Sequence, residues 1–484
     1  MHIDSLTENR RLRRTKILAT LGPSSNDEET IGRLIAAGAN VFRLNMSHGT
    51  HEDHANTYRN VRRAAEKSSS KVTVLADLCG PKIRTGVFES GPVELATGQE
   101  VVVACRDVSG TERLIPCQYR ELAQDVTDGD RILLDDGNLE LRVKSVAGDD
   151  IACEVINGGV LSDHKGINLP GVDLSTPSLT DHDRSDAHFA LDLGVDFLAL
   201  SFVRHSSDID MLRALVNEHD VHVAIIAKIE KPEALENIDD ILEAADGIMV
   251  ARGDLGVEMP PQTVPQAQDE LIDLARTHRK PVIVATQMLE SMIQHPRPTR
   301  AEVTDVANAV RHGADVVMLS AETAAGKYPV EAVQMMDRVA RQTESFQSAR
   351  GSLASLPEDF ESRANLPAED ALADAISHLS RRLNVSAVVV FSLNDHSLAV
   401  MSSFRPAAAL IGICHDEGSS RIANMLWGVN PVTMNTDNAA SPEHMARQVA
   451  YEHGHAEKGQ TILMVRGFSS NPEDNMPSVT VITL

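Results

Sequence analysis

The chain has 484 residues, of which 42% are hydrophobic, so it can fill the cores of two to four domains. Its formal charge of −25 argues against a nucleic-acid-binding surface, because phosphate backbones require clustered lysine and arginine. We expect a cytoplasmic protein without membrane contact, since the five cysteines are scattered without a CxxC pair and no apolar run is long enough to span a bilayer.

Eight strand-like apolar runs, seven of them followed directly by a helical pattern, predict a (β/α)8 TIM barrel. Acidic residues, threonine or proline open several of these helices, for example Asp27 before a helix that ends at Gly38. We assign residues 1–87 and 173–346 to this barrel. The runs are 17–23, 41–45, 72–78, 196–204, 222–230, 247–254, 281–287 and 315–321.

Short alternating strands interrupt the third repeat of the barrel. The turn Asp135-Asp136-Gly137-Asn138 precedes LELRV, in which apolar and charged residues alternate with period two. We therefore expect an all-β lid domain, residues 88–172, inserted at the rim of the barrel that carries the chemistry. Such a domain can close over a site and exclude water.

A polar stretch at 347–368 is interpreted as a linker. Beyond it, the runs AVVVF, ALIGIC, TILMV and SVTVITL and the helix-like segment RIANMLWG predict a separate α/β domain over residues 369–484.

Polar residues follow the barrel runs at their carboxyl ends, which in a parallel barrel form one rim. Glu230 and Asp254 end successive strands, and two carboxylates with open coordination positions suit Mg²⁺ or Mn²⁺. Lys228 shares a strand face with Glu230, and a lysine beside a metal can stabilise a phosphoryl group in transfer. A structural ion pair between Lys228 and Glu230 is the alternative.

The second and third strands add further polar residues to this rim. Arg43 ends the second strand, where an arginine can grip a phosphate with two parallel hydrogen bonds. The others at these two strand ends are Asn45, Ser47, Asp77, Lys82 and Arg84. Together they predict a site for an anionic substrate, unless they are scattered surface charges.

Thr286, Ser320 and Glu322 follow the seventh and eighth strands. Two hydroxyls and an acid on neighbouring strands suit a relay that delivers a proton to a carbanion or enolate. Taken singly, each could instead be a helix cap.

Ten motifs, in order over about residues 15 to 346, resemble pyruvate kinase. The resemblance implies an enzyme that transfers the phosphoryl group of phosphoenolpyruvate to ADP and then protonates the enolate to give pyruvate, the last step of glycolysis. It also implies a homotetramer with a regulatory C-terminal domain. The motifs are ILATLGPSS, NVFRLNMSHG, GPKIRTG, DDGNLELRV, KGINLPG, FLALSFVR, AKIEKPEALENIDDI, GIMVARGDLGVE, ATQMLESM and MLSAETAAGKYP.

The resemblance also implies roles for individual residues. Lys228 and Arg43 would bind the phosphoryl group, while Glu230 and Asp254 would hold the divalent metal. The backbone amides of Gly253 and Asp254, with Thr286, would bind the substrate carboxylate. The implied proton relay consists of Ser320 and Glu322, and the implied nucleotide-binding residues are Asn45, His48, Arg84 and Lys165.

Two positions depart from family members that need K⁺. In those members K⁺ is held by residues matching Asn45, Ser47, Asp77 and the carbonyl of Leu78, with glutamate in place of Lys82 and threonine in place of Leu78. The ammonium of Lys82 can supply, beside Asp77, the positive charge that K⁺ otherwise supplies. We therefore expect activity without K⁺.

The C-terminal domain departs from members regulated by fructose 1,6-bisphosphate. Those members carry a Thr-x-Ser-Gly-x-Thr loop, whereas this chain has Asp395 in place of the glycine, which removes backbone freedom and adds a negative charge. We expect this ligand to bind poorly. Ser392, Asn394 and Ser397 could accommodate another phosphorylated effector, such as a sugar monophosphate or a nucleotide. A purely structural oligomerisation domain is the alternative.

Two other functions are compatible with parts of the sequence. A metal-dependent barrel lyase acting on a pyruvate enolate would also use Glu230 and Asp254, but it has no need of a nucleotide lid or Lys165. A catalytically silent metabolite sensor is the second, and the retained rim residues argue against it.

Overall fold

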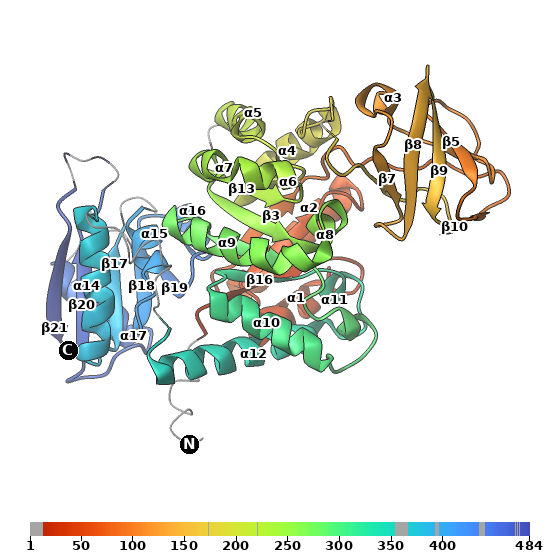
Figure 1. The fold of residues 1–484 in the computed structure, drawn as a ribbon. Helices are drawn as coiled ribbons and strands as arrows, with labels where there is room; N and C mark the ends of the chain where they lie inside the picture. Colours follow the sequence, from red (N-terminus) through yellow and green to blue (C-terminus); the bar gives the residue numbers. More distant parts are fainter. Residues whose placement is uncertain are drawn as a thin grey trace.

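The chain folds into a barrel, a lid domain and a C-terminal domain in the computed structural model (Figure 1). The structure describes residues 13–172, 174–219, 221–353, 366–392, 396–434, 441–469, 471, 473 and 475–484. Within these residues, none of the helices has the length and apolar character needed to cross a membrane.

Eight parallel strands close into a barrel in the order β1-β16-β15-β14-β13-β12-β3-β2, which confirms the predicted fold. Nearly all their residues are buried, as expected when helices cover the outside and side chains fill the interior. Each predicted run overlaps one strand. The strands are β1 (Lys16–Thr20), β2 (Val41–Asn45), β3 (Thr73–Asp77), β12 (Phe197–Leu200), β13 (Ala224–Ile229), β14 (Gly247–Ala251), β15 (Val282–Ala285) and β16 (Val316–Leu319).

Local capping signals define the helices around the barrel. Asp27 accepts a hydrogen bond from the amide of Thr30 at the start of α1, and Gly38 ends α1 with a φ of 116°. Thr299 and Glu302 form a capping box at the start of α10. The helices are α1 (Glu28–Ala37), α2 (His51–Lys67), α4 (Asp181–Leu193), α5 (Ser206–Asn217), α6 (Pro232–Glu236), α7 (Ile238–Ala244), α8 (Arg252–Glu258), η3 (Pro261–Thr263), α9 (Val264–Thr277), η4 (Glu290–Ile293), α10 (Arg300–His312), α11 (Ala321–Ala324) and α12 (Pro329–Arg350).

The lid domain is a six-stranded sheet, β11-β7-β8-β9-β5-β6, with a separate strand pair, β10-β4. Leu139, Leu141 and Val143 of β8 are buried in its core, which confirms the alternation expected there. The proposed limits of this domain, 88–172, stay a prediction. Its elements are β4 (Val93–Leu95), β5 (Glu100–Ala104), β6 (Leu114–Pro116), α3 (Leu122–Asp125), β7 (Arg131–Leu134), β8 (Leu139–Ala147), β9 (Asp150–Asn157), β10 (Gly159–Leu161) and β11 (Ile167–Asn168).

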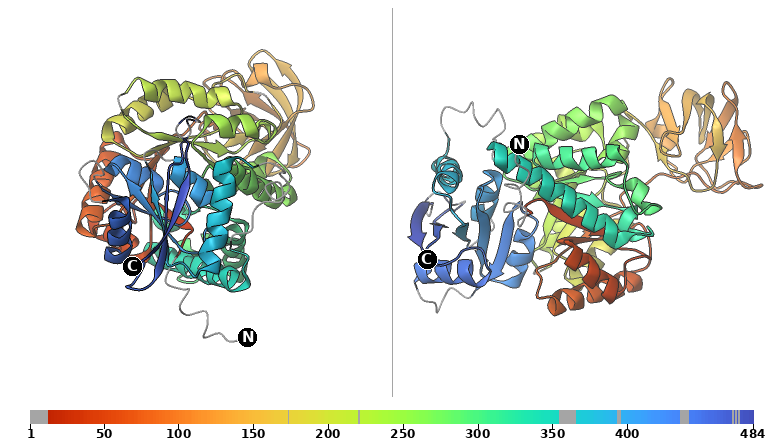
Figure 2. Two further views of the ribbon diagram at one scale, coloured as in Figure 1. Left: turned by 90° about the vertical axis from the view of Figure 1, so that its left-hand side faces the viewer. Right: turned by 90° about the horizontal axis from the view of Figure 1, so that it is seen from below.

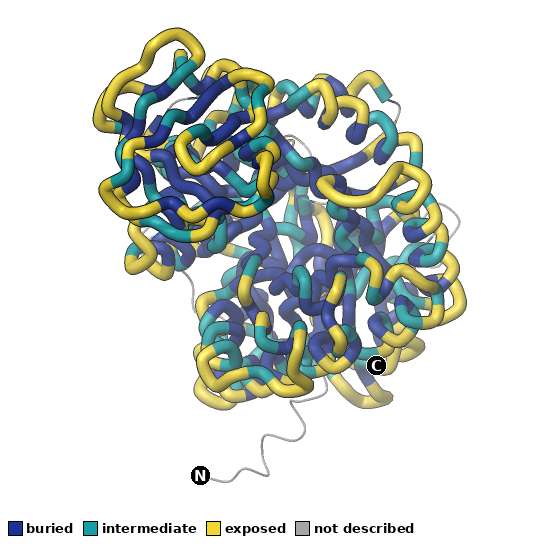
Figure 3. The backbone as a smooth tube through the Cα atoms, turned by 90° about the vertical axis from the view of Figure 1, so that its right-hand side faces the viewer, coloured by how far each residue is buried: buried dark blue, intermediate teal, exposed yellow. Residues whose placement is uncertain are grey.

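The lid and the C-terminal domain lie at opposite ends of the molecule, with the barrel between them (Figures 1 and 2). Buried backbone gathers inside the barrel and inside the lid sheet, and exposed loops surround both (Figure 3). The barrel and the lid therefore have separate cores.

The C-terminal domain has a five-stranded sheet in the order β19-β18-β17-β20-β21, in which only β21 is antiparallel to its neighbour. Helix α12 continues to Arg350, into the stretch predicted as a linker from 347, and most of the rest of that stretch lies outside the described residues. The elements are α14 (Ala368–Arg382), β17 (Ala387–Phe391), α15 (His396–Ser403), β18 (Ala409–Cys414), α16 (Glu417–Ala423), β19 (Val429–Thr433), α17 (Pro442–Glu452), β20 (Thr461–Arg466) and β21 (Ser478–Thr483).

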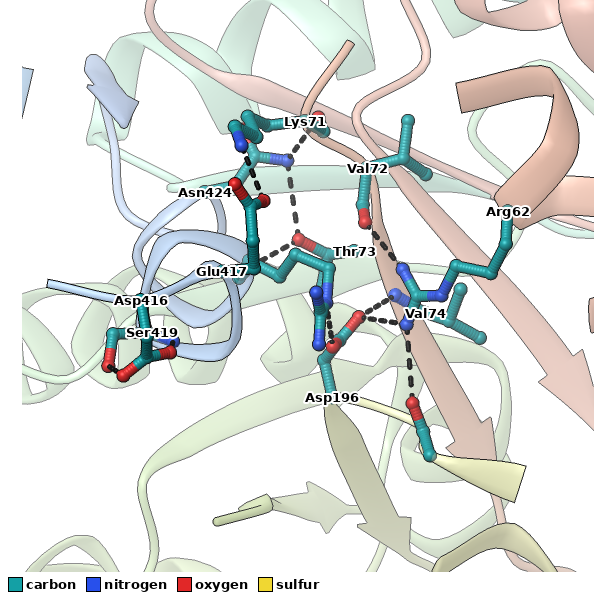
Figure 4. A network of polar contacts seen from close by, with 12 residues as sticks. Arg62, Lys71, Val72, Thr73, Val74, Asp196, Asp416, Glu417, Ser419 and Asn424 are labelled. Carbon is teal, nitrogen blue, oxygen red and sulfur yellow. Dashed lines mark hydrogen bonds and ion pairs between the residues drawn. The ribbon is translucent and has the colours of Figure 1, made fainter. Parts of the chain in front are cut away.

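The C-terminal domain packs against the amino-terminal end of the barrel strands. Met425 belongs to the same buried cluster as Leu18 and Phe197 in the barrel interior. Figure 4 shows polar contacts of this junction, among them those of Lys71 and Asn424. Arg421 Nε donates to Asp196 Oδ1 over 2.6 Å. The opposite, carboxyl end of the barrel therefore remains accessible beside the lid.

This junction also corrects one prediction. The helix expected over RIANMLWG ends at Ala423, because the next residue is used in contacts with the barrel. The side-chain amide of Asn424 donates to the carbonyl of Lys71 and to Oγ1 of Thr73 (Figure 4). It also donates to the carbonyl of Asn40. Tertiary hydrogen bonds thus override a helical pattern.

Candidate active site

A cleft of about 820 Å³ opens at the carboxyl ends of the barrel strands. The barrel contributes the turns after β14, β15 and β16, and the lid contributes Asp136. Five predicted site residues line it, namely Lys82, Gly253, Asp254, Thr286 and Ser320. The rim predicted from the strand ends is therefore a real cleft between the barrel and the lid.

Asp77, at the end of β3, lies between two cations. Arg43 Nε donates to its Oδ2 over 2.6 Å, and Lys228 Nζ lies 3.3 Å from its Oδ1. Burial alone would raise the pKa of Asp77, but the charges of Arg43 and Lys228 hold this pKa below its ordinary value. Asp77 is therefore a carboxylate that fixes both cations at the ends of their strands.

Lys228 is held by three partners at the end of β13. Its Nζ lies 2.8 Å from Glu230 Oε1 and donates to Ser201 Oγ over 2.6 Å. Burial alone would lower the pKa of Lys228, but Asp77 and Glu230 raise it overall, so the ammonium stays charged. The ion pair considered as an alternative therefore exists, and it fixes a charged group at the rim.

Ser201 is a residue that the sequence analysis missed. Its Oγ donates to the carbonyl of Leu78 over 2.7 Å while it accepts the bond from Lys228. Ser201 comes directly after the strand-forming run FLAL, so its place at a strand end was the only available signal.

Glu230 has the environment of a metal ligand. Its Oε2 accepts the amide of Phe202 over 2.9 Å, and its side chain is 2% exposed. Burial raises the pKa of Glu230, Lys228 opposes the rise, and the charge of Asp254 adds to it. A divalent cation between these two carboxylates would offset their repulsion.

The two carboxylates suit a metal that keeps most of its coordination sphere for other ligands. In the described part of the chain, no group of three His, Cys, Asp or Glu side chains could hold a metal ion. Glu230 and Asp254 would then supply two ligands, and water or substrate oxygens the remainder, which is typical of Mg²⁺.

Thr286 and Gln287, directly after β15, both adopt left-handed backbone conformations, with φ values of 68° and 54°. Such a conformation costs of order 1–3 kcal/mol for a residue other than glycine. The amide of Gly253 donates to Thr286 Oγ1 over 2.8 Å, and Thr286 Oγ1 donates to the carbonyl of Ala285 over 2.6 Å. The Gly253 amide, expected at the substrate carboxylate, therefore bonds to Thr286 in this structure.

Ser320 and Glu322 are neighbours at the end of β16. Glu322 is buried, and its two oxygens accept the amides of Ser320, over 2.7 Å, and Leu289, over 3.0 Å. Ser320 lines the cleft and makes no capping hydrogen bond to α11. Glu322 thus holds two rim segments together, and only Ser320 of this pair reaches the cleft.

Lys82 does not lie beside Asp77 in this structure. It is exposed on the wall of the cleft, and it makes no ion pair with any described residue. The negative charge of Asp77 is balanced by Arg43 and Lys228 instead. The expected pairing of Lys82 with Asp77 is therefore not observed.

The expected nucleotide residues form two groups. Asn45 accepts the amide of Ser47 through its side chain and the amide of His48 through its carbonyl, so these residues share the turn after β2. Arg84 pairs through its backbone with Gly166, which places it near Lys165 at the base of the lid. Lys165 forms a 2.7 Å ion pair with Asp135.

Of the three expected effector residues, the two that the structure describes are not exposed. Ser392 and Ser397 are both buried, and Ser397 Oγ donates to the carbonyl of Phe468 over 3.2 Å. Asn394 lies outside the described residues.

Comparisons with known proteins cover nearly the whole chain. The family model for the barrel domain of pyruvate kinase matches residues 12–333, and the model for the alpha/beta domain of pyruvate kinase matches residues 370–481. A pyruvate kinase of Geobacillus stearothermophilus is 45% identical over 421 residues, which are 86% of this chain and 71% of that protein.

A pyruvate kinase of Staphylococcus aureus (strain MRSA252) is 41% identical over 459 residues, which are 94% of this chain and 78% of that protein. Among solved structures, a pyruvate kinase from Cryptosporidium parvum matches with a TM-score of 0.88 at 35% identity, over 99% of this chain and 97% of that chain.

Proposed function

Because the chain belongs to the pyruvate kinase family, whose enzymes are phosphotransferases that act on phosphoenolpyruvate and ADP, we propose a division of roles among the residues of the cleft. The observation that carries the proposal is the network of Arg43, Asp77, Lys228 and Glu230. It draws side chains from three barrel strands to one rim within ion-pair distance. The cleft can then hold two polyanionic substrates together.

Arg43 and Lys228 bind the phosphoryl group during its transfer. Both are largely buried, at 11% and 12% exposed, where electrostatic interactions are stronger than in water. Asp77 fixes their positions, so little reorganisation is needed as charge develops on the transferring group.

Glu230 and Asp254 hold Mg²⁺ or Mn²⁺. When bound, the ion supplies positive charge to the oxygens of the phosphoryl group and of the enolate. The raised pKa of Glu230 supports this role, since burial and the charge of Asp254 disfavour the ionised carboxylate and a divalent cation would offset this effect. Thr286 and the amides of Gly253 and Asp254 bind the substrate carboxylate.

Ser320 delivers the proton that converts the enolate to pyruvate, with Thr286 as the second hydroxyl at the cleft. The contacts of Glu322 support an indirect part, in which it fixes the Ser320 backbone. Asn45 and His48 from the barrel, with Arg84 and Lys165 from the lid, bind the nucleotide.

Activity does not depend on K⁺. Lys82 supports this proposal because its ammonium lies on the cleft wall without a carboxylate partner among the described residues. It can therefore supply positive charge to the anionic substrates directly, and Asp77, Asn45, Ser47 and the Leu78 carbonyl need no monovalent cation.

The protein works in the cytoplasm as a homotetramer. A phosphorylated effector other than fructose 1,6-bisphosphate binds near Asn394. The burial of Ser392 and Ser397, and the hydrogen bond from Ser397 to the carbonyl of Phe468, support an indirect role for these two residues rather than direct contact with the effector. A kinetic screen of phosphorylated metabolites at subsaturating phosphoenolpyruvate tests this part, and sedimentation velocity tests the tetramer.

The experiment that tests the function is a lactate-dehydrogenase-coupled assay with phosphoenolpyruvate, Mg²⁺ and ADP. We expect pyruvate formation that requires ADP and is abolished by chelation of the metal. Pyruvate formation without ADP would instead indicate the lyase considered above. Absence of turnover together with binding of a metabolite would indicate a sensor.

A further inference from the structure

The strained turn after β15 needs stabilising contacts, and none of the residue roles proposed above provides them. Thr286 is β-branched, and its φ of 68° lies in a region that such side chains rarely adopt. Gln287 repeats the left-handed conformation at 54°. Two successive residues of this kind persist only where the surroundings hold them.

Arg252, the first residue of α8, donates hydrogen bonds to the two backbone carbonyls on either side of the Thr286 Cα. Its Nε donates to Ala285 O over 3.1 Å, and its Nη2 donates to Thr286 O over 2.5 Å. These two carbonyls flank the Thr286 residue itself. The guanidinium therefore restrains the orientation of both peptide groups that define the strained conformation.

The other end of the guanidinium is fixed to two helices. Nη1 donates to Asp305 of α10 over 2.7 Å and to Gln268 of α9 over 3.3 Å. The side chain is 12% exposed. Arg252 thus connects the turn to two helices on the outside of the barrel, and these helices hold the guanidinium in place.

Gly253 contacts Thr286 through the side-chain hydroxyl of Thr286. Its amide donates to Thr286 Oγ1 over 2.8 Å, and a Cβ at this position would lie 3.5 Å from the Thr286 side chain. Neighbouring residues therefore hold the carbonyl and the hydroxyl of Thr286 separately. Only a planar group with donors on three nitrogens can make the contacts of Arg252 simultaneously, so lysine is not equivalent.

We propose that Arg252 is a positioning residue that holds Thr286 in its left-handed conformation and thereby fixes the position of the Thr286 side chain at the proposed carboxylate site. The kinetic consequence rests on the proposed function of Thr286 as part of the carboxylate site. The structural consequence, a change of φ at residue 286, does not depend on any activity.

The test compares Arg252→Ala and Arg252→Lys with the wild type. We expect the Michaelis constant for phosphoenolpyruvate to rise about 10- to 100-fold in both, because small displacements of a positioning group have effects of this size. The Michaelis constant for ADP should change less than about twofold, since none of the residues that we propose to bind the nucleotide belongs to this turn. Free guanidinium at millimolar concentration should restore the constant for phosphoenolpyruvate in Arg252→Ala, whereas methylammonium should not.

A crystal structure of Arg252→Ala, with and without guanidinium, supplies the second readout. We expect φ of Thr286 to leave the left-handed region and to return when guanidinium occupies the vacated space. If Arg252→Ala does not fold, Asp305→Asn, which weakens only the contact of Arg252 with α10, takes its place, with the Michaelis constants and φ of Thr286 as readouts and without guanidinium.

Retention of a positive φ at Thr286 in the variant would overturn the inference, as would an unchanged Michaelis constant for phosphoenolpyruvate in a folded Arg252→Ala enzyme. A wild-type protein without ADP-dependent turnover would refute the proposed function alone, because the crystal structure still decides whether Arg252 holds the turn.

Discussion

At the scale of single residues, Asp77 organises the charges at the carboxyl ends of the barrel strands. Its two oxygens contact different cations, Arg43 through Oδ2 and Lys228 through Oδ1. A buried carboxylate between two cations is stabilised in its charged form, and it restrains both cations in return. The site is therefore preorganised by a residue that is not itself assigned to the substrate.

Replacing Lys228 with Met removes the ammonium that faces the transferring phosphoryl group. We expect the turnover number to fall by about 10²- to 10³-fold, the range seen when one preorganised charge donor is lost. The coupled assay measures this change. Lys16→Met is a matched control, because it removes a buried lysine at the opposite end of the barrel. Equal turnover in Lys228→Met and wild type would exclude Lys228 from the mechanism.

Replacing Lys82 with Glu reverses the charge on the cleft wall. We expect the wild type to keep its activity when K⁺ is replaced by a tetraalkylammonium ion, and Lys82→Glu to become K⁺-dependent. The reason is that the variant loses the cation we propose to act on the substrates and gains a carboxylate that a monovalent cation can neutralise. Near-complete loss of wild-type activity in the tetraalkylammonium buffer would refute K⁺ independence.

At the scale of elements, the barrel brings the rim residues together because each strand ends at the same level. β2 and β3 are in parallel register with Asn45 opposite Asp77, and β13 and β14 with Lys228 opposite Met249. Side chains at the strand ends therefore converge, although Arg43 and Asp254 lie more than 200 residues apart in the sequence.

The same regularity explains which elements could be predicted from the sequence. Buried parallel strands are short runs of valine, isoleucine and leucine bounded by polar residues, and the capping residues Asp27 and Thr299 are local signals. The end of α16 at Ala423 could not be predicted, because it depends on hydrogen bonds between Asn424 and the barrel.

Some positions in the site could likewise be predicted from local patterns, and others could not. The positions of Lys228 and Glu230 on one strand face follow from a period of two. Ser201 and Arg252 act through contacts with residues distant in sequence, namely Leu78 and Ala285, so their places at strand ends do not by themselves reveal these roles. The place of Lys82 away from Asp77 depends on the path of the loop after β3, which strand periodicity does not define.

The contact between β1 and β19 should make the free energy of unfolding depend on pH. Lys16 donates to the carbonyl of Val429 over 2.6 Å, and burial lowers its pKa to about 7. Below pH 7 Lys16 is protonated in both the folded and the unfolded chain. Between pH 7 and its ordinary value of 10.5 the unfolded chain binds the additional proton, so this group makes stability rise with pH.

In denaturant unfolding, the free energy of unfolding of the wild type should therefore rise between pH 7 and pH 10. This rise should be smaller in Lys16→Met. The variant removes a buried charge, so its stability at pH 7 should equal or exceed that of the wild type. Identical pH slopes for the two proteins would show that Lys16 does not titrate in this range.

At the scale of the whole molecule, the lid contacts α8, which also carries Asp254. Asn168 of β11 donates to Glu258 Oε1 over 3.0 Å, and Lys231 forms a 3.0 Å ion pair with the same oxygen. The C-terminal domain packs at the other end of the barrel (Figure 1). A movement of the lid is thus connected to the metal-binding segment through one short helix.

Replacing Asn168 with Ala should loosen the lid without unfolding the barrel. Loss of one hydrogen bond costs about 1 kcal/mol, and Glu258 retains Lys231 as a partner. We expect faster amide hydrogen exchange in the lid, with exchange in the barrel strands unchanged. Equal acceleration in both domains would mean that this contact supports the global fold instead.

In the proposed function, Arg43, Lys228, Glu230 and Asp254 act together on one bound substrate at the carboxyl end of the barrel. A crystal structure with Mn²⁺ and oxalate, an analogue of the enolate, tests it through the anomalous signal of the metal. We predict one Mn²⁺ ligated by Glu230 and Asp254, with oxalate bound to it beside Lys228. A metal bound elsewhere, or oxalate out of reach of these residues, would contradict the claim.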